Sequence, residues 1–192
     1  MIKFTRILVI SLCISLLLPA LLTARGGTEQ TESLGDISTL EQISVTVGTG
    51  SVIIRGGSEA SATSRVSPDL AEELGIRVRV SRQGGLATVT LLPAEETGGS
   101  FSIPWNAVLE LKLVIPPGIA VSVATGDGRV NLRDVEGRFS VRTGSGSITG
   151  RRIRISGPSE FLTGMGNISL QVSEGREFIE AMNAGMGQVE LR

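Results

Sequence analysis

The side chains that could do chemistry in this sequence are its carboxylates and its arginines. Downstream of residue 24 the chain has no histidine, cysteine or tyrosine, and its only lysine is Lys112. This part of the chain therefore lacks the usual general base near neutral pH, the thiol nucleophile and the commonest transition-metal ligand. Paired carboxylates, which glycosidases use, remain. Because Asp127, Asp134 and Glu136 lie in turns or between arginines, we interpret them as solubilising surface residues and expect no enzyme, no metal site and no cofactor.

The arginines are more informative because they alternate with apolar residues between positions 129 and 155. If the apolar residues point inward, the arginines point outward, and on stacked strands they would form a basic stripe. Guanidinium groups bind carboxylates, sulfates and phosphates bidentately. The candidate ligand-binding face comprises Arg129, Arg133, Arg138, Arg142 and Arg154. The alternative is an ordinary solvated face whose charge is neutralised by Asp127, Asp134 and Glu136.

Trp105 is the only tryptophan, in a chain with 3% aromatic residues. It lies in the segment FSIPWN, before a predicted strand. An exposed tryptophan can stack on a sugar, so Trp105 joins the candidate ligand-binding face. The alternative, which we favour, is that it plugs an open end of the core.

Glycine-rich turns separate short apolar runs from residue 121 onward. The turns read TGDG at 125–128, TGSG at 143–146 and TGMG at 163–166, with looser copies at 47–50 and 183–187. They are not phosphate-binding loops, because a strand rather than a helix follows each one. They also lack the aspartate that a calcium-binding nonapeptide repeat needs in every copy. We interpret them as structural turns.

The elements that must position these residues are strands, because the apolar residues between the turns recur at every second position. The final glycines of successive turns lie 18, 20 and 21 residues apart. Such a period predicts an all-β fold, a parallel β-solenoid in which each rung buries its apolar face on its neighbours. An antiparallel meander is the alternative, since a glycine-rich turn between alternating strands is also a hairpin signal. The predicted inward residues are Val45, Val47, Val123, Val130, Leu132, Phe139, Val141, Ile148, Ile168, Leu170, Val189 and Leu191.

The segment LELKLVIPPGIAVSVATGDGRVNLRDVEGRFSVRTGSGSITG, residues 109–150, resembles the bacterial putative-adhesin family of β-strand-repeat domains of unknown function. Members begin with a "vPxg" segment, here residues 115–118, and continue with repeated TGsG turns, here those starting at residues 125, 143 and 163. The resemblance covers residues 43–191. It implies a β-solenoid-like fold and a cell-envelope setting, and it implies no catalytic residues.

The N-terminal half is less regular than the rest. A first pair of strands is predicted over 43–55, and residues 57–75 interrupt the repeat with a polar loop and a short helix. Ser67 is a candidate N-cap, Pro68 suits the first helical position and Gly75 can end the helix. Residues 76–80 and 86–91 alternate around a glycine-containing turn and predict a hairpin. A further strand is predicted over 108–115.

The N-terminus reads as a targeting segment. Lys3 and Arg6 precede an apolar run over 7–22, and a signal peptide over 1–24 would be cleaved after Ala24. A signal anchor is the alternative. We expect a polar, flexible leader over 25–40 and a single domain over 41–192. Cleavage would also remove Cys13, leaving no disulfide.

Charge and location complete the functional hypothesis. Losing the two basic residues of the signal would lower the formal net charge from −1 to about −3, which implies no general attraction to nucleic acid and no membrane insertion after cleavage. We therefore expect an exported protein of the periplasm or cell surface. Its expected function is non-catalytic, as a structural or adhesin-like module that presents its solenoid face to an unknown envelope polymer or protein. The alternative is an enzyme that acts on envelope polysaccharide through paired carboxylates.

Overall fold

The computed structural model of the protein describes residues 28–92 and 108–192. The predicted signal peptide and Trp105 lie outside these residues. Within them, the fold is all-β with one α-helix, which confirms the predicted class. No helix of the described part is long and apolar enough to cross a membrane.

The strands differ in regularity between the two halves of the chain. In order, the elements are β1 (Thr28–Ser33), a 3₁₀ turn η1 (Ile37–Thr39), β2 (Gln42–Thr49), β3 (Ser51–Gly56), β4 (Ser61–Val66), α1 (Pro68–Leu74), β5 (Arg77–Gln83), β6 (Leu86–Leu92), β7 (Leu109–Ile115), β8 (Ile119–Asp127), β9 (Val130–Arg133), β10 (Glu136–Ser145), β11 (Ile148–Ile155), β12 (Ser159–Met165), β13 (Ile168–Glu174), a 3₁₀ turn η2 (Arg176–Phe178), β14 (Ile179–Met186) and β15 (Val189–Leu191).

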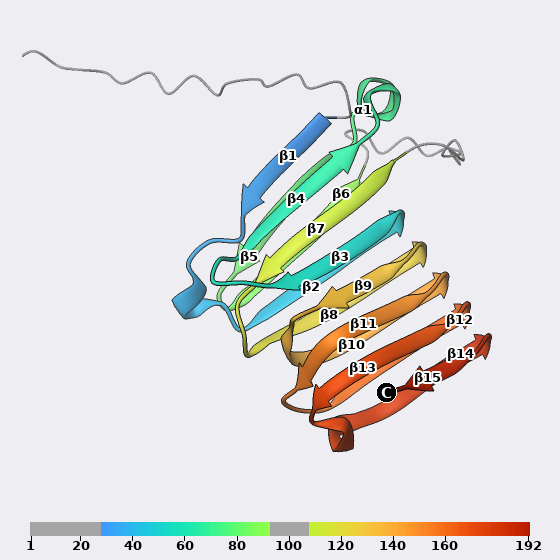
Figure 1. Ribbon diagram of the computed structural model, residues 1–192. Coiled ribbons are helices and arrows are strands. Elements are labelled where there is room, and N and C mark those ends of the chain that lie inside the picture. Colours follow the sequence, from blue (N-terminus) through green and yellow to red (C-terminus); the bar gives the residue numbers. More distant parts are fainter. Residues whose placement is uncertain (1–27, 93–107) are drawn as a thin grey trace, which may run out of the picture.

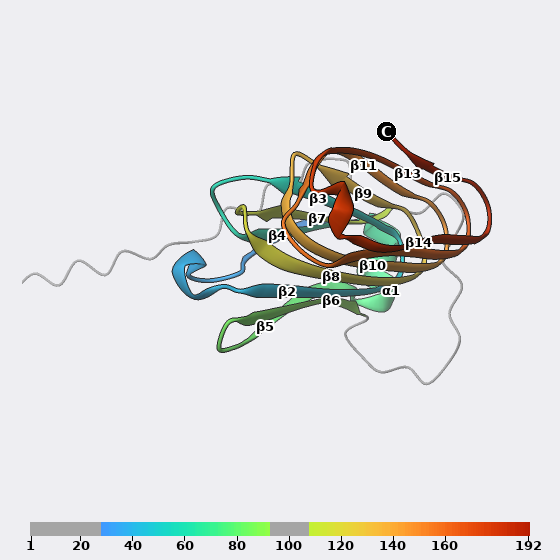
Figure 2. The same ribbon diagram turned by 90° about the horizontal axis from the view of Figure 1, so that it is seen from below.

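One mixed sheet of these strands folds over into two facing layers (Figures 1 and 2). The first layer runs β1-β4-β7-β3-β9-β11-β13-β15, and the second runs β5-β6-β2-β8-β10-β12-β14. The start of β10 pairs with the end of β11 and joins the layers. The sheet therefore resembles a nearly closed barrel, and the two inner faces enclose the core.

From β8 onward the chain alternates between the two layers, and each strand pairs in parallel with the next strand of its own layer. Val121 of β8 lies opposite Phe139 of β10, and Val141 lies opposite Phe161 of β12. Phe161 in turn lies opposite Met182 of β14. The antiparallel meander is therefore wrong for this part of the chain, because no strand here pairs with its immediate successor along the chain in antiparallel register.

The early strands β2 and β3 belong to the same parallel stack. Val45 of β2 lies opposite Val123 of β8, and Ile54 of β3 lies opposite Leu132 of β9. The predicted strands over 43–55 are confirmed. The chain between β3 and β8 builds β4, α1, β5, β6 and β7 at the end of this stack (Figure 1). There β6 pairs in parallel with β2, and β7 pairs in parallel with β3.

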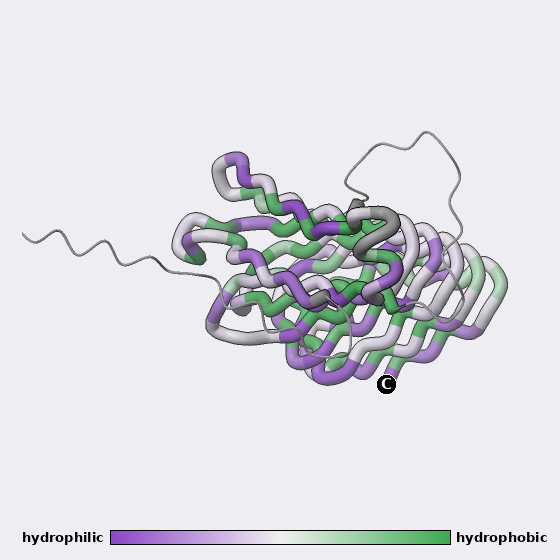
Figure 3. Tube along the Cα trace, turned by 90° about the horizontal axis from the view of Figure 1, so that it is seen from above, coloured by the Kyte–Doolittle hydropathy of each residue, from purple (hydrophilic) through white to green (hydrophobic). Residues whose placement is uncertain are grey.

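Hydrophilic and hydrophobic residues alternate along the strands (Figure 3). The buried apolar residues form the core between the layers. Phe139 and Phe161 pack with their ring centroids 6.4 Å apart. All the predicted inward residues are buried except the last two. Val189 and Leu191 remain 46% and 41% exposed, because they belong to β15, which has a pairing partner on one side only among the described strands.

The irregular part largely follows the sequence prediction. Helix α1 has Pro68 in its first turn, and Gly75 ends it in the left-handed conformation with φ 57°. Ser67 occupies the N-cap, but its hydroxyl makes no capping bond and instead accepts a hydrogen bond of 2.6 Å from the Val108 backbone N–H. The hairpin is confirmed as β5 and β6, and the strand over 108–115 as β7.

Two strands were not predicted. Residues 28–33 fall within the expected flexible leader, yet they form β1, which pairs antiparallel with β4. β4 itself lies in the segment predicted as a polar loop. Both escaped the sequence analysis because they are mostly Thr, Ser and charged residues. β1 is an edge strand, where polar side chains face solvent, and only Leu34 and Leu40 around it reach the core.

Candidate functional site

The five candidate arginines do not share one face. Arg138 and Arg142 project from β10 on the outside of the second layer, whereas Arg133 and Arg154 belong to β9 and β11 of the first layer. Arg129 precedes β9 in an exposed turn. The predicted stripe is therefore divided between the two layers, because the chain bends between β9 and β10 and changes layer.

Two of these arginines are in ion pairs between neighbouring strands. Arg142 Nη2 lies 2.5 Å from Glu160 Oε1 of β12. Arg154 Nη1 lies 3.0 Å from Glu136 Oε2, and its Nε lies 3.8 Å from Glu174 Oε1. These side chains are largely exposed, so each pair adds little to stability.

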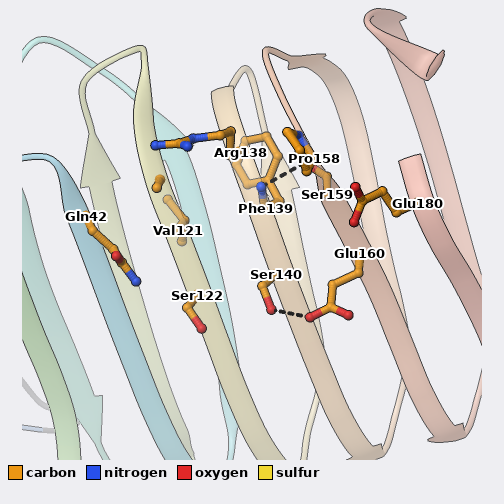
Figure 4. Close-up of a pocket in the computed structure, with 11 residues that line it drawn as sticks. Gln42, Val121, Ser122, Arg138, Phe139, Ser140, Pro158, Ser159, Glu160 and Glu180 are labelled. Atoms are coloured by element: carbon orange, nitrogen blue, oxygen red, sulfur yellow. Dashed lines mark hydrogen bonds between the residues drawn. The ribbon is translucent and has the colours of Figure 1, made fainter. Parts of the chain in front are cut away.

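A shallow groove of about 300 Å³ crosses the outer face of the second layer (Figure 4). Its polar side chains come from five strands, β2, β8, β10, β12 and β14, and carry both signs of charge. They are Gln42, Ser122, Arg138, Ser140, Glu160 and Glu180. Ser44, Ser122 and Ser140 lie opposite one another on adjacent strands, so hydroxyl groups recur across this face at the strand spacing.

Glu160 is the best-defined carboxylate of the groove. It accepts hydrogen bonds from Ser140 Oγ at 2.7 Å and from Arg142 Nη2. The Ser140 hydrogen bond first, and then Arg142, lower the pKa of Glu160 below its ordinary value. A general acid needs the opposite shift, since it must hold its proton near neutral pH. Glu160 is therefore suited to accept hydrogen bonds rather than to donate a proton.

A second hollow, of about 480 Å³, lies where the chain passes between the layers. Its charged residues pair internally, because Arg152 bonds Asp134 and Arg154 bonds Glu136. The hydrogen bond from Arg152 is the main cause that lowers the pKa of Asp134, and the charges of Arg152, Arg133 and Arg55 lower it further. The charges that line this hollow are thus already satisfied within the protein.

A third hollow, of about 200 Å³, lies on the outer face of the first layer. It is lined by Thr149, Arg151, Ser169, Gln171 and Arg192 among others. The sequence analysis named none of these residues, because Arg151 follows a glycine and a polar residue rather than an alternating apolar run. In the part of the chain that the structure describes, no group of three or more His, Cys, Asp or Glu side chains could hold a metal ion.

Comparison with known proteins gives fold neighbours alone. No family model and no curated protein sequence matches the chain. Among solved structures, a putative cell adhesion protein from Clostridium sporogenes ATCC 15579 matches with a TM-score of 0.52 and 10% identity, over 86% of this chain and 98% of that one. The protein therefore shares its fold, which agrees with the family resemblance of the sequence.

Two weaker matches have related descriptions. A putative adhesin from Bacteroides fragilis NCTC 9343 matches with a TM-score of 0.30 and 7% identity, over 88% of this chain and 98% of that one. A putative lipid binding protein from Parabacteroides distasonis ATCC 8503 matches with a TM-score of 0.30 and 10% identity, over 87% and 98%.

Proposed function

We propose that this protein is a non-catalytic, exported cell-envelope binding module that presents the face of a β-solenoid to an envelope polymer or protein. The parallel stack from β8 to β15, with β2 and β3 above it, is the solenoid. Each rung contributes one strand to each layer. The TGxG turns are its corners.

The observation that carries this proposal is the parallel, in-register pairing of successive strands. In such a stack, outward side chains at equivalent positions lie opposite one another, as Ser122, Ser140 and Glu160 do. A straight row that repeats at the strand spacing of about 4.8 Å suits a partner that is itself extended and repetitive. The shared fold with a protein described as a cell adhesion protein agrees with this role.

Export is part of the proposal, and its support is the pattern of residues 1–24. We expect the mature chain to begin near Arg25 and to reside in the periplasm or on the cell surface. Mass spectrometry of the native N-terminus tests this directly. Recovery of an intact Met1 on a membrane-bound product would replace secretion with anchoring.

Binding is tested by co-sedimentation of the purified protein with isolated bacterial envelope fractions and with insoluble polysaccharides. We expect retention on at least one envelope fraction, and a globular protein of similar net charge serves as the control. Recovery of the protein in every supernatant, at the level of that control, would remove the binding role.

The alternative is a carbohydrate-active enzyme that uses paired carboxylates, and Glu160 and Glu180 in one groove are the observation that favours it (Figure 4). The lowered pKa of Glu160 counts against it. Chromatography of each retained polysaccharide after long incubation separates the two functions. Release of shorter saccharides that is lost in Glu160→Gln would establish the enzyme.

A further inference from the structure

The outer face of the first layer carries a row of arginines from distant parts of the sequence. Arg55 of β3 lies opposite Arg133 of β9, and Arg133 lies opposite Arg151 of β11. The row continues with Gln171 of β13. Backbone hydrogen bonds between β13 and Arg192 bring a fourth arginine alongside, and this one is paired with Glu190 at 2.7 Å. We call Arg55, Arg133 and Arg151, with Gln171 and Arg192 beyond them, the arginine ladder.

The first three arginines of the ladder form no ion pair within the described part of the protein, although the charges of Arg133 and Arg55 act on Asp134 at longer range. Arg55 and Arg151 are exposed and Arg133 is half-buried. Among the described residues, no carboxylate lies within 4.0 Å of the guanidinium nitrogens of these three. Arg133 Nε donates only to Asn131 Oδ1, at 3.3 Å. Asp134, the nearest acid along the chain, is engaged by Arg152.

Three like charges on adjacent strands are an unfavourable arrangement. Neighbouring strands lie about 4.8 Å apart, and like charges directly opposite each other destabilise a sheet. Anions bound along the row would relieve this repulsion. A carboxylate fits such a row, because the planar guanidinium can bind both of its oxygens.

A second row of hydrogen-bonding groups lies beside the ladder, and its last hydroxyl, that of Ser169, already bonds Glu190 Oε2 at 3.2 Å. Asn131 lies opposite Thr149, and Thr149 lies opposite Ser169. Each of the three strands β9, β11 and β13 thus offers one cation or amide and, two residues earlier, one hydroxyl or amide. The hollow of about 200 Å³ lies where both rows meet, between Thr149, Arg151, Ser169 and Gln171.

We propose that the arginine ladder binds a linear acidic polysaccharide that carries a carboxylate on each sugar. The strand spacing is close to the length of one pyranose unit in an extended chain, so successive carboxylates can meet successive arginines. The row of Asn131, Thr149 and Ser169 hydrogen-bonds the sugar hydroxyls. This inference rests on the proposed binding function and assigns it a site and a ligand class.

Two other polyanions fit the same face less well. Single-stranded nucleic acids gain much of their affinity from bases stacked on aromatic side chains, and neither row contains an aromatic residue. An anionic membrane attracts a clustered basic surface, whereas this ladder is one residue wide and the same face carries Glu110 and Glu190. Both polyanions are therefore included in the test as competing ligands.

The test is isothermal titration of the full-length purified protein with polygalacturonate. Highly methyl-esterified polygalacturonate is the uncharged match, and single-stranded DNA and phosphatidylglycerol vesicles are the competing polyanions. We expect binding to polygalacturonate alone, and we expect this binding to weaken as the salt concentration is raised.

The variant Arg133→Gln/Arg151→Gln should bind polygalacturonate about tenfold more weakly or worse. Glutamine already occupies this row at position 171, so the substitution suits the fold, and an unchanged thermal midpoint verifies that.

The matched control is Arg77→Gln/Arg79→Gln, which removes the same charge from exposed positions of β5 in the other layer. It should retain the affinity of the unmodified protein within about twofold. Equal weakening in both variants would mean that net charge alone drives binding, and would overturn the ladder. So would tighter binding to DNA, to the vesicles or to the methyl ester.

The envelope co-sedimentation assay on the same samples distinguishes failure of the arginine ladder from failure of the proposed binding function. Retention on envelope fractions without any affinity for polygalacturonate overturns the ladder and leaves the proposed function standing. Absence of both overturns both.

Discussion

At the scale of single residues, glycines at the ends of the parallel strands are required by contact between neighbouring strands. A Cβ atom on Gly146 would lie 2.0 Å from the carbonyl oxygen of Gly128, and Gly146 itself has φ +134°. The same contact recurs between Gly166 and Gly146. A side chain at these corners would push the rungs apart, so the glycines set the close stacking that aligns the outward rows.

We therefore expect Gly146→Ala to destabilise the protein by about 1–3 kcal/mol, the range for backbone strain of this kind. Urea unfolding measures the change. Gly48→Ala is the matched control, because a Cβ there would meet no atom within 4 Å. If both variants unfolded at the same urea concentration, the stacking role of Gly146 would be refuted.

The threonine that opens each turn provides a second residue-scale comparison. Thr143 Oγ1 donates to the carbonyls of Ser145 at 3.1 Å and of Gly128 at 3.3 Å. The equivalent hydroxyl of Thr125 is buried and has no hydrogen-bond partner among the described residues. The same residue type thus contributes differently in successive rungs.

Thr143→Val should cost about 1 kcal/mol of unfolding free energy, whereas Thr125→Val should be neutral or stabilising by a similar amount, because it removes an unsatisfied buried hydroxyl. Thermal and urea unfolding of the two variants side by side checks this. A larger loss in Thr125→Val than in Thr143→Val would contradict the hydrogen-bond assignment.

At the scale of elements, Glu160 links β12 to β10 through Ser140 and Arg142. Its pKa is lower in the folded protein than the ordinary value of 4.5. The stabilisation is therefore present above the unfolded pKa and is lost as the pH falls through the folded pKa. We expect the urea midpoint to fall as the pH is lowered below the ordinary glutamate value of 4.5, and to fall less in Glu160→Gln. Identical falls in both proteins would show that this contact does not contribute.

The elements predicted from the sequence are those with a strong alternating pattern. The turn spacing of 18, 20 and 21 residues recurs in the pairing of Val121 with Phe139, Val141 with Phe161 and Phe161 with Met182. β1 consists of polar residues and pairs with β4 at the edge of the sheet. β4 buries alternate residues, but of Ala62, Ser64 and Val66 only the last is strongly apolar. Periodicity alone cannot reveal strands of that kind.

The arginine ladder could be identified only from the strand pairing in three dimensions. Arg133 was a candidate from the sequence, but its neighbours Arg55 and Arg151 come from strands that only the register places beside it. Arg138 and Arg142, although closer in sequence than Arg55, belong to the other layer because the chain turns between β9 and β10. Sequence proximity thus predicted the residue type and the outward orientation but not the set that shares a face.

At the scale of the whole molecule, the excursion between β3 and β8 leaves the stack continuous. β9 pairs with β3 and places Arg133 beside Arg55, although 78 residues separate the two arginines. The ladder therefore spans three adjacent strands, about 10 Å from its first to its third guanidinium row. A ligand that uses all three must be at least as long as this span.

The most direct measurement of the central claim is the affinity of galacturonic acid, its dimer and its trimer for the protein. If the rungs bind successive carboxylates, the trimer should bind at least about tenfold more tightly than the monomer, because the second and third contacts form intramolecularly. The gain should vanish in Arg133→Gln, which interrupts the row at its centre. Equal affinity of monomer and trimer, or a length dependence that survives Arg133→Gln, would contradict the account.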